Sequence, residues 1–457
     1  MNSKETQLFS DTPITKAVLK LTIPTVIGQL ITVVYNMADT FFIGQLNDPL
    51  QVAAATIAMP IFMFLNAFAN LFGIGGASLI SRCLGRDDKK RARHCASFSF
   101  WAGIGAAFLY GMCILLLEKS LFPILGASQE TWDYCKQYVF WTIGIGAIPT
   151  VLNVEIAHLI RAEGYSKQAG FGVAFGGILN IILDPIFIFV FKMEIKGAAI
   201  ATMLSNLIAM CYFLFFLYYI RENTVITPNP REFSTKDNIP HEVISVGVTG
   251  FAMTTMATIS NTALNHIVAN YSSKAIAGMG IAKKIDSLAY AIAQGMTQGT
   301  LPLIGYNYTS GNWKRMIKAI KTAFSYSLIV ACLGTLFLYF MAAPISQFFI
   351  DEAETVQYGK SFLKIICLAC PTTAASFMAI TIFQAVGKTK QPLLLTLVRK
   401  GSLDVFLMIL FRRVIGIKGV AWATPVADWV AFIISIVFIV VYLKGLSKEK
   451  VFSHTKN

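Results

Sequence analysis

Charged side chains are scarce in this sequence, because Asp, Glu, Lys and Arg together make up only 14% of its 457 residues, whereas hydrophobic residues make up 55%. The mean hydropathy is +0.62. Soluble globular domains carry about 25% charged residues, so this composition excludes an ordinary soluble fold. Apolar runs of about 18 residues or more recur along the chain, and each can cross a hydrocarbon core of about 30 Å. The composition therefore predicts an integral membrane protein.

The sequence also lacks the short motifs of common enzyme classes. It contains no H-E-x-x-H, no G-x-S-x-G and no G-x-x-x-x-G-K-[ST], and its five histidines are scattered. We therefore expect no enzyme activity, no cofactor and no ATP hydrolysis by this chain. The N-terminus has no short apolar region followed by a small-residue cleavage site, so we expect the first span to be retained.

Nearly all of the eight cysteines fall within apolar segments, which argues against a disulfide framework of the secreted kind. Cys367 and Cys370 form a C-x-x-C in the middle of an apolar stretch. Packing is the favoured interpretation there, over redox or metal chemistry.

The formal charge of +14 comes from Lys and Arg that concentrate in alternate loops. One such run extends from Arg82 to Arg93, whereas the loops at 45–50 and 351–357 are nearly free of basic residues. This is the positive-inside asymmetry of membrane proteins, and it favours the lipid bilayer over nucleic acid as the partner. It places both termini in the cytoplasm, although Arg412, Arg413 and Lys418 fall on the opposite side.

About twelve apolar segments predict an all-α membrane protein. Residues 221–241 mix charges with three prolines and have no apolar period, so they predict a cytoplasmic linker between an N-lobe at 1–220 and a C-lobe at 242–457 that ends in a basic tail. The expected spans are 16–42, 52–80, 95–118, 134–158, 169–191, 196–220, 243–269, 275–305, 316–342, 358–385, 391–411 and 417–443.

The two halves resemble each other at a separation of 222 or 223 residues. The stretch from Ile195 to Thr202 is echoed by the stretch from Ile417 to Thr424, and Pro149 by Pro371. Six spans per half give both copies the same orientation, which predicts parallel repeats about an axis along the membrane normal. We expect two pseudo-symmetric six-helix lobes around a central cavity.

Asp39 lies late in the first apolar segment, fifteen residues after Pro24. An ionisable residue inside a span costs roughly 3 kcal/mol on insertion scales, so it is a functional candidate by default. Tyr35 and Asn36 lie on the same helical face and predict a supporting polar network. Pro24 removes a helix hydrogen bond and predicts a bend of the first span.

The fifth span places Asn180 and Asp184 four residues apart on one face, and the sixth repeats that spacing with Thr202 and Asn206. These oxygen donors suit either a proton shared between carboxylates or a hard monovalent cation such as sodium. The alternative is that each group is satisfied separately by neighbouring backbone. We expect no other metal.

Several motifs together resemble the multidrug and toxic compound extrusion (MATE) family, in the right order along essentially the whole chain. They are Ile23-Pro24 with Tyr35-Asn36 through Asp39, Ser81 through Gly85, Ile160 through Gly164, Asn180 through Pro185, and Gln298 through Tyr308.

This resemblance implies a bacterial inner-membrane antiporter that expels cationic or amphipathic drugs in exchange for protons or sodium ions. It also implies that Asp39 is the coupling-ion residue, and that Asn180 and Asp184 complete the N-lobe site, joined by Thr202 in some members. We expect a monomer.

The C-lobe departs from one branch of the family, because no acid occurs at 243–269 or 362–385. An ion pair with Lys400 is favoured for Asp404, with substrate contact as the alternative. In span eight, Lys283, Lys284 and Asp286 could either form a local ion pair or line the cavity. The candidate C-lobe cavity residues are Lys283, Lys284, Asp286, Arg399, Asp404 and Asp428.

Two further sets of residues are weaker candidates. Glu155 and His158 could line the cavity, and His158 could equally be a satisfied helix-end histidine. Arg161 and Glu163 favour a loop-fixing pair over a substrate site. The main rival function is a flippase for lipid-linked saccharides, because Lys283, Lys284, Arg399 and Lys400 would suit a pyrophosphate, whereas the acidic N-lobe set opposes it. A channel also fits the composition.

Overall fold

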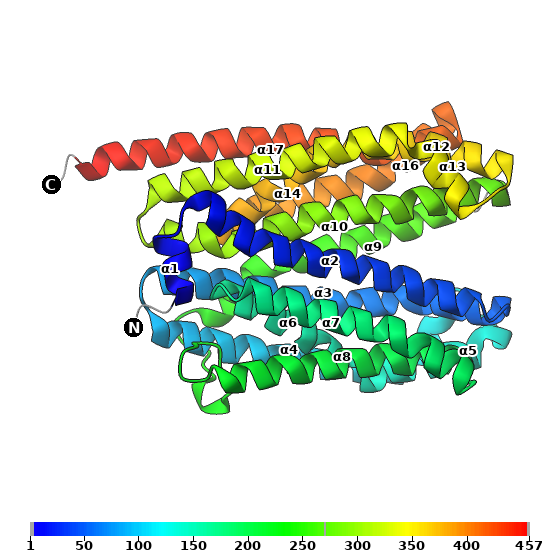
Figure 1. The fold of residues 1–457 in the computed structure, drawn as a ribbon, viewed down its shortest axis with the longest axis horizontal. Coiled ribbons are helices and arrows are strands. Elements are labelled where there is room, and N and C mark those ends of the chain that lie inside the picture. The colour runs from blue at the N-terminus through cyan, green and yellow to red at the C-terminus, as the bar shows by residue number, and fades with distance from the viewer. Residues whose placement is uncertain (1–3, 269–270, 455–457) are drawn as a thin grey trace. The chain divides into compact units, whose positions relative to one another are not determined.

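The computed structural model describes residues 4–268 and 271–454, and within these ranges every regular element is helical (Figure 1). Residues 455–457 of the predicted basic tail lie outside the described residues. The α-helices are α1 (Lys4–Ser10), α2 (Ile14–Gly44), α3 (Pro49–Gly85), α4 (Lys89–Ile124), α5 (Gln129–Val139), α6 (Ala147–Ala162), α7 (Ser166–Pro185), α8 (Glu194–Tyr219), α9 (Ile239–Val268), α10 (Ser273–Thr309), α11 (Trp313–Phe340), α12 (Ala342–Phe349), α13 (Ala353–Ile366), α14 (Cys370–Ala385), α15 (Lys390–Thr396), α16 (Ser402–Ile415) and α17 (Ile417–His454).

Short helices of other types interrupt some of these segments. π-Helices follow α5, α7 and α15, and 3₁₀-helices lie in the linker and between α13 and α14. They are η1 (Phe140–Ile145), η2 (Ile186–Val190), η3 (Pro230–Glu232), η4 (Cys367–Ala369) and η5 (Leu397–Gly401). Such insertions let one span continue through a local change of direction.

Each predicted span falls on a helix or on consecutive helices. In the described ranges, nine of these segments are long and apolar enough to cross a membrane, and α5–η1 with α6 forms a tenth that is bent by 51°. Two further segments, α10 and α15–η5–α16, are more charged and hold most of the predicted C-lobe candidates. The all-α membrane fold is therefore confirmed.

The helices are longer than the predicted spans. The 37 residues of α3 give a length of about 55 Å, which exceeds a hydrocarbon core of about 30 Å. Asp48 caps the start of this helix by accepting from the backbone of Leu50 at 2.9 Å. A helix longer than the hydrocarbon core must tilt or extend beyond it, so apolar composition alone does not mark where the helix ends.

The helices form two compact units. Unit 1 contains residues 1–258, 294–323 and 384–387, and unit 2 contains residues 259–293, 324–383 and 388–457. The second half of α10 thus belongs to unit 1. This division follows packing, whereas the predicted lobes follow the sequence repeat, and the lobe boundaries stay a prediction.

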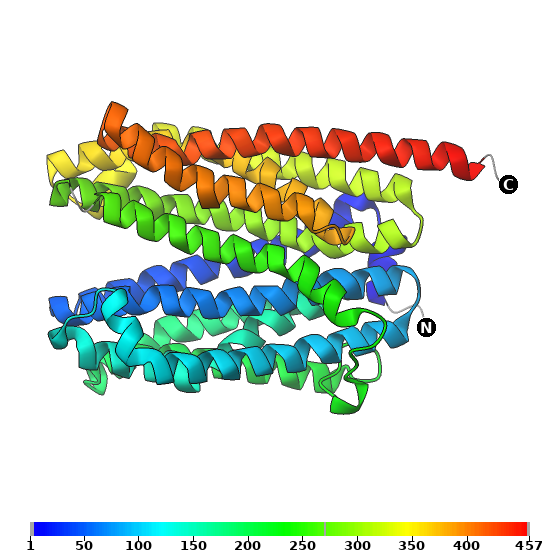
Figure 2. The same cartoon turned by 180° about the vertical axis from the view of Figure 1, so that it is seen from behind.

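Each unit has its own apolar core. In unit 1, α3, α4 and α6 surround Ile80, Cys95 and Ile156, which are fully buried. In unit 2, α13 contributes Phe362, and α16 packs against α17 (Figure 2). These cores fix the helices that carry the polar side chains described below.

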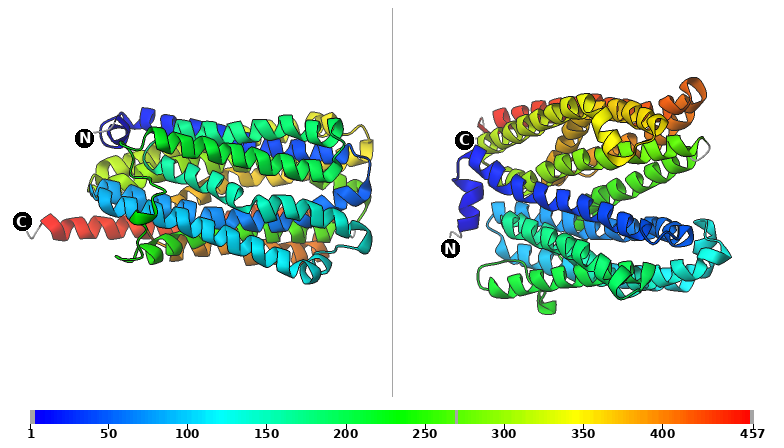
Figure 3. Two further views of the ribbon diagram at one scale, coloured as in Figure 1. Left: turned by 90° about the horizontal axis from the view of Figure 1, so that it is seen from below. Right: turned by 45° about the vertical axis from the view of Figure 1, so that its right-hand side comes forward.

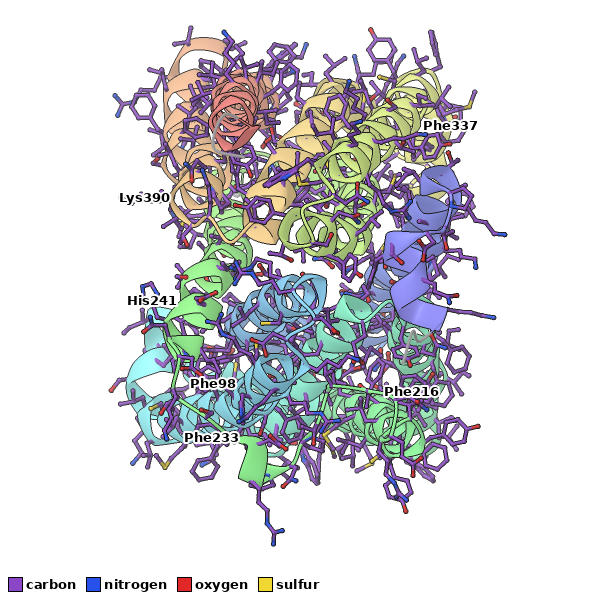
Figure 4. All side chains as sticks on the ribbon, turned by 90° about the vertical axis from the view of Figure 1, so that its left-hand side faces the viewer. Phe98, Phe216, Phe233, His241, Phe337 and Lys390 are labelled. Carbon is purple, nitrogen blue, oxygen red and sulfur yellow. The ribbon has the colours of Figure 1, made fainter. Side chains whose placement is uncertain are left out.

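The linker at 221–238 is packed against α4 in unit 1. Trp101 donates a hydrogen bond to the carbonyl oxygen of Pro228 at 3.0 Å. The rings of Phe98 and Phe233 lie 5.8 Å apart, and both side chains are visible in Figure 4. The linker is therefore an ordered surface segment.

The repeat predicted from sequence has a structural counterpart at two glycines. A Cβ atom at Gly197 would lie 2.7 Å from the carbonyl oxygen of Phe187, and one at Gly419 would overlap the carbonyl of Phe411. Both glycines therefore allow the same close approach of a helix start to the preceding segment.

Candidate functional site

Glycines of α7 bring it close to α2, and these two helices pack along each other (Figures 1 and 3). A Cβ at Gly170 would overlap the carbonyl of Pro24, and one at Gly177 would lie 2.8 Å from Ile31 and 3.1 Å from Tyr35. Small residues at helix contacts permit such packing inside a membrane. The pairing holds Asp39 of α2 near the polar end of α7.

Three of the predicted N-lobe residues form one hydrogen-bonded cluster. Asn180 donates from Nδ2 to Oδ1 of Asp184 at 3.2 Å and to Oγ1 of Thr202 at 3.4 Å. Asn180 and Asp184 are 1% and 0% exposed. The i, i+4 spacing therefore does place the amide beside the carboxylate, and α8 supplies the hydroxyl.

Asp39 completes this set by electrostatics rather than by a direct hydrogen bond. Its charge interacts with that of Asp184, and Tyr35 and Tyr138 lie within reach of both carboxylates. Tyr138, on α5, is 8% exposed and was not predicted. A single tyrosine in an apolar segment carries no pattern that would have identified it.

Three oxygens of the N-lobe set are buried without a hydrogen-bond donor among the described residues. They are Oδ1 of Asp39, Oδ1 of Asn180 and Oδ2 of Asp184. Buried polar atoms are paired in about 90% of cases or more, so three unpaired acceptors in one cluster are unusual. An added proton or a hard monovalent cation would satisfy them, and the residues fit either.

Two of the predicted supporting residues, Asn36 and Asn206, donate to backbone carbonyl oxygens. Asn36 donates to the carbonyl of Thr32 at 2.9 Å. Asn206 donates to the carbonyl of Thr202 at 2.9 Å and accepts from Asn153 of α6 at 2.9 Å. Asn153 was also missed, although a lone amide in the middle of a span was a readable signal.

Pro24 lies inside α2, which continues as one α-helix through this position. Thr25 donates its hydroxyl to the carbonyl of Leu21 at 2.8 Å. Because Pro24 has no N–H, it cannot bond the carbonyl one turn before it. The helix therefore lacks one backbone hydrogen bond at the point where α2 contacts Gly170.

In unit 2, Asp404 lies among hydroxyl donors. Ser260 donates to its Oδ2 at 2.6 Å, and Thr424 donates to its Oδ1 at 3.2 Å. The Nζ of Lys400 lies 3.8 Å from Oδ2, which is ion-pair distance but too long for a hydrogen bond. Both carboxylate oxygens are therefore satisfied.

Asp428 forms the second polar cluster of unit 2. Arg399 donates from Nε to Oδ1 at 2.7 Å, and Thr373 donates to Oδ2 at 2.6 Å. The guanidinium also lies 4.2 Å from the ring centroid of Phe377, which is a cation–π distance. Sequence spacing did not predict this pair, because its members come from η5 and α17.

These clusters border one small cavity in unit 2. Lys283 pairs with Asp286 at 3.3 Å, so Asp286 is both paired and at the cavity wall, whereas Lys284 is exposed. Cys367 and Cys370 are free and buried, and Cys370 reaches the cavity. The lining residues are Asp286, Ala289, Tyr290, Cys370, Thr373, Arg399, Lys400, Thr424 and Asp428.

The remaining candidates lie in unit 1, in the last two turns of α6 or directly after it. His158 accepts from Arg161 at 3.2 Å and contacts Asn70 at 3.3 Å. Glu155 is fully buried, and neither carboxylate oxygen has a partner among the described residues. Glu163 accepts from the hydroxyl of Thr224 and so holds the linker.

Comparisons with known proteins agree with this arrangement. The MatE family model matches residues 24–186 and 250–410, one stretch in each predicted half. The multidrug export protein MepA of Staphylococcus aureus is 27% identical over 430 residues, covering 94% of both chains. MepA of Staphylococcus haemolyticus is 28% identical over 447 residues, covering 97% of both.

A solved structure of the outward-facing conformation of a multidrug resistance MATE family transporter superposes with a TM-score of 0.91. It is 26% identical, and the match covers 98% of this chain and 99% of that chain. The family consists of transporters rather than enzymes, and the predicted resemblance is confirmed. This multi-pass membrane protein belongs to the MatE family of multidrug efflux transporters.

Proposed function

We propose that this protein is a secondary-active antiporter that exports cationic or amphipathic drugs in exchange for protons or sodium ions. The observation that carries this proposal is the set of three unpaired acceptor oxygens from Asp39, Asn180 and Asp184. A cluster that is short of donors binds a proton or a cation more readily than an anion. The similar protein MepA is described as a multidrug export protein, which supports drug export as the function of this chain.

The coupling ion would bind among the N-lobe oxygens. Asp39 and Asp184 supply negative charge, and Asn180 and Thr202 supply neutral oxygens. Two carboxylates in a protein interior repel each other, so a positive charge between them lowers the free energy of the cluster. No other cofactor is required by this exchange.

Movement of α2 would link ion binding to drug release. Asp39 and Pro24 lie on the same helix, and Pro24 marks the point where a backbone hydrogen bond is missing. A positive charge that joins Asp39 to Asp184 would draw the later part of α2 toward α7. The weakened turn at Pro24 would then absorb the change in direction.

The distribution of basic residues supports an inner-membrane location in bacteria with both termini in the cytoplasm. We assign residues 1–220 and 242–457 to two lobes around a central drug-binding cavity, in accord with the sequence repeat. The complete polar set occurs within one chain, which favours a monomer.

Exchange can be measured in inverted vesicles with a fluorescent organic cation and one imposed gradient at a time, either protons or sodium. We expect one of the two gradients to drive uptake into the vesicles by the unaltered protein. Asp39→Asn should abolish that uptake, whereas Asp133→Asn, which makes the same change at an exposed position of α5, should not. Gradient-driven uptake by Asp39→Asn at the unaltered rate would refute the assignment.

A flippase for lipid-linked saccharides is the second candidate, and the charge pairing of unit 2 weighs against it. Each basic side chain near the cavity has an acidic partner: Arg399 pairs with Asp428, and Lys283 with Asp286. A pyrophosphate carries several negative charges and needs a surplus of positive charge. A lipid-flipping assay beside the drug assay separates the two functions.

A further inference from the structure

A small cavity lies inside unit 1, where α3 and α6 meet the second half of α10 and the end of α14. Its polar wall consists of His158, Arg161, Gln298 and Gln384. The volume of ≈ 10 Å³ is about the space for one water molecule. We call this contact between helices of the two sequence halves the seam. Ser78 of α3 donates to the carbonyl oxygen of Gln384 at 2.5 Å, which holds the seam closed.

Arg161 brings a positive charge into the seam without a negative charge beside it. The residue is 4% exposed, and its Nε has no hydrogen-bond partner among the described residues. It forms none of the ion pairs found in that part of the chain. Glu155 of the same helix is directed at Gly103 of α4, and Glu163 accepts from Thr224. Burying an unpaired charge is costly, so Arg161 is a functional candidate.

Arg161 fixes the protonation state of His158. A guanidinium group only donates hydrogen bonds, so Nδ1 of His158, which lies 3.2 Å from Nη1 of Arg161, is the acceptor and carries no hydrogen. The ring hydrogen is then on Nε2, which lies 3.3 Å from Oδ1 of Asn70. Asn70 donates from Nδ2 to the hydroxyl of Thr254 at 2.9 Å, which leaves Oδ1 as its acceptor. Arg161 and Asn70 therefore fit the neutral ring, and a second proton on the ring would face the guanidinium.

His158 and Arg161 lie at the opposite end of unit 1 from the acidic cluster. Arg161 is in the last turn of α6, and α7 begins at Ser166 and carries Asp184 near its other end. From residue 166 to residue 184 the helix rises by about 27 Å, which is close to the thickness of a hydrocarbon core. The seam therefore lies between the predicted ion site and the membrane surface at the far ends of these helices.

A histidine beside a water molecule can relay protons, because an imidazole accepts a proton at one nitrogen and releases it from the other. In the seam such a relay would let protons cross without drug. Arg161 opposes this relay in two ways. Its hydrogen bond occupies Nδ1 of His158, the acceptor nitrogen of the neutral ring, and its charge repels an approaching proton. Pores that pass water but exclude protons use a fixed positive charge in the same way.

We propose that Arg161 is a positioning residue that keeps protons from crossing the closed seam by holding His158 neutral. The proposal deepens the proposed exchange function and rests on it, because a leak matters to a transporter that depends on an ion gradient. The barrier itself is measured without drug. A protein that fails to exchange drug for ions and a seam that fails to exclude protons therefore give different results.

Proton entry is measured in proteoliposomes that contain a pH-sensitive dye, under an imposed pH gradient, with the voltage held at zero and no drug present. Arg161→Met should raise proton entry about tenfold or more over the unaltered protein, because it removes the charge and frees Nδ1 of His158. Arg161→Lys keeps a donor and a positive charge, and it should leak no faster than the unaltered protein. Arg93→Met is the matched control, since Arg93 is exposed on α4 of the same unit.

A second substitution separates the relay from loosened packing. His158→Gln combined with Arg161→Met should return proton entry to the unaltered rate, because glutamine does not relay protons. Sodium entry, followed with a radioactive tracer, should be the same in all variants. The proposal is overturned if Arg161→Met admits protons no faster than the unaltered protein, or if the double variant leaks as much as the single one. A rise of sodium entry together with proton entry would also overturn it, because Arg161 then only packs the seam.

Nitrogen-15 NMR of the unaltered protein with labelled histidine tests the state of the ring without any change at Arg161. The spectrum of His158→Gln identifies the signal that belongs to His158. We expect a neutral ring with its hydrogen on Nε2 at neutral pH. A ring with a hydrogen on Nδ1 under these conditions would contradict the proposed role of Arg161.

Discussion

Gly170 of α7 lies so close to Pro24 of α2 that a single methyl group at Gly170 would overlap the proline carbonyl. The contact joins the helix that carries Asn180 and Asp184 to the helix that carries Asp39. Any movement of α2 at Pro24 must therefore slide against Gly170.

Gly170→Ala should separate α2 from α7 and lower both stability and transport. Overpacking of this kind costs about 1–3 kcal/mol. Gly105→Ala is the matched control, because a Cβ at Gly105 would meet no atom within 4 Å. Melting curves and vesicle uptake measure the two effects. Equal behaviour of the two variants would show that α2 does not depend on this contact.

Arg399 and Asp428 form a buried ion pair. Replacing one of them should destabilise the protein strongly, whereas replacing both by apolar residues should destabilise it much less. Removing one member of a buried pair costs about 3–5 kcal/mol, because the other charge is left unpaired. We therefore expect Asp428→Leu to melt well below the unaltered protein. Arg399→Met combined with Asp428→Leu should recover most of that loss, and a double variant as unstable as the single one would contradict this account.

The sequence predicted those parts of the site that depend on helix periodicity. Asn180 and Asp184 are one turn apart, and the structure joins them by a hydrogen bond. Asp39 was identified by the cost of a charge in an apolar segment, which does not require knowledge of the fold. A residue that only tertiary packing brings to the site, such as Tyr138, has no such signal.

The C-lobe shows the same limit more clearly. Lys400 and Asp404 are four residues apart, so their pairing could be read from the sequence. The two partners of Asp428, in contrast, come from two other segments, α14 and η5. Lys284 was a candidate because of its charge, but it is exposed on α10. Sequence periodicity predicts which residues share one face of a helix. Only the packed structure shows which residues of other segments contact that face.

A surface cluster of unit 2 predicts a pH dependence of stability. Hydrogen bonds from Thr355 and Lys274 lower the pKa of Glu352, which precedes α13. A depressed pKa in the folded state stabilises the protein above the unfolded pKa of about 4.3, and the stabilisation is lost as the pH falls through the folded pKa. Thr355→Ala should therefore lower Tm at pH 7, and the difference from the unaltered protein should shrink below about pH 4. A difference that is constant across this range would mean that Glu352 is not involved.

Gly103 of α4 provides the space for the carboxyl group of Glu155, since a Cβ at Gly103 would lie 2.9 Å from its Cδ and overlap one oxygen. Gly103→Ala should therefore destabilise the protein. Glu155→Ala removes the group that collides with the new methyl, so the double variant should be more stable than the sum of the single effects indicates. Residues in direct contact show interaction energies of about 0.5–3 kcal/mol in such cycles. Melting temperatures of the unaltered protein, the two single variants and the double variant give this coupling. If the two single effects simply add, Glu155 does not contact Gly103.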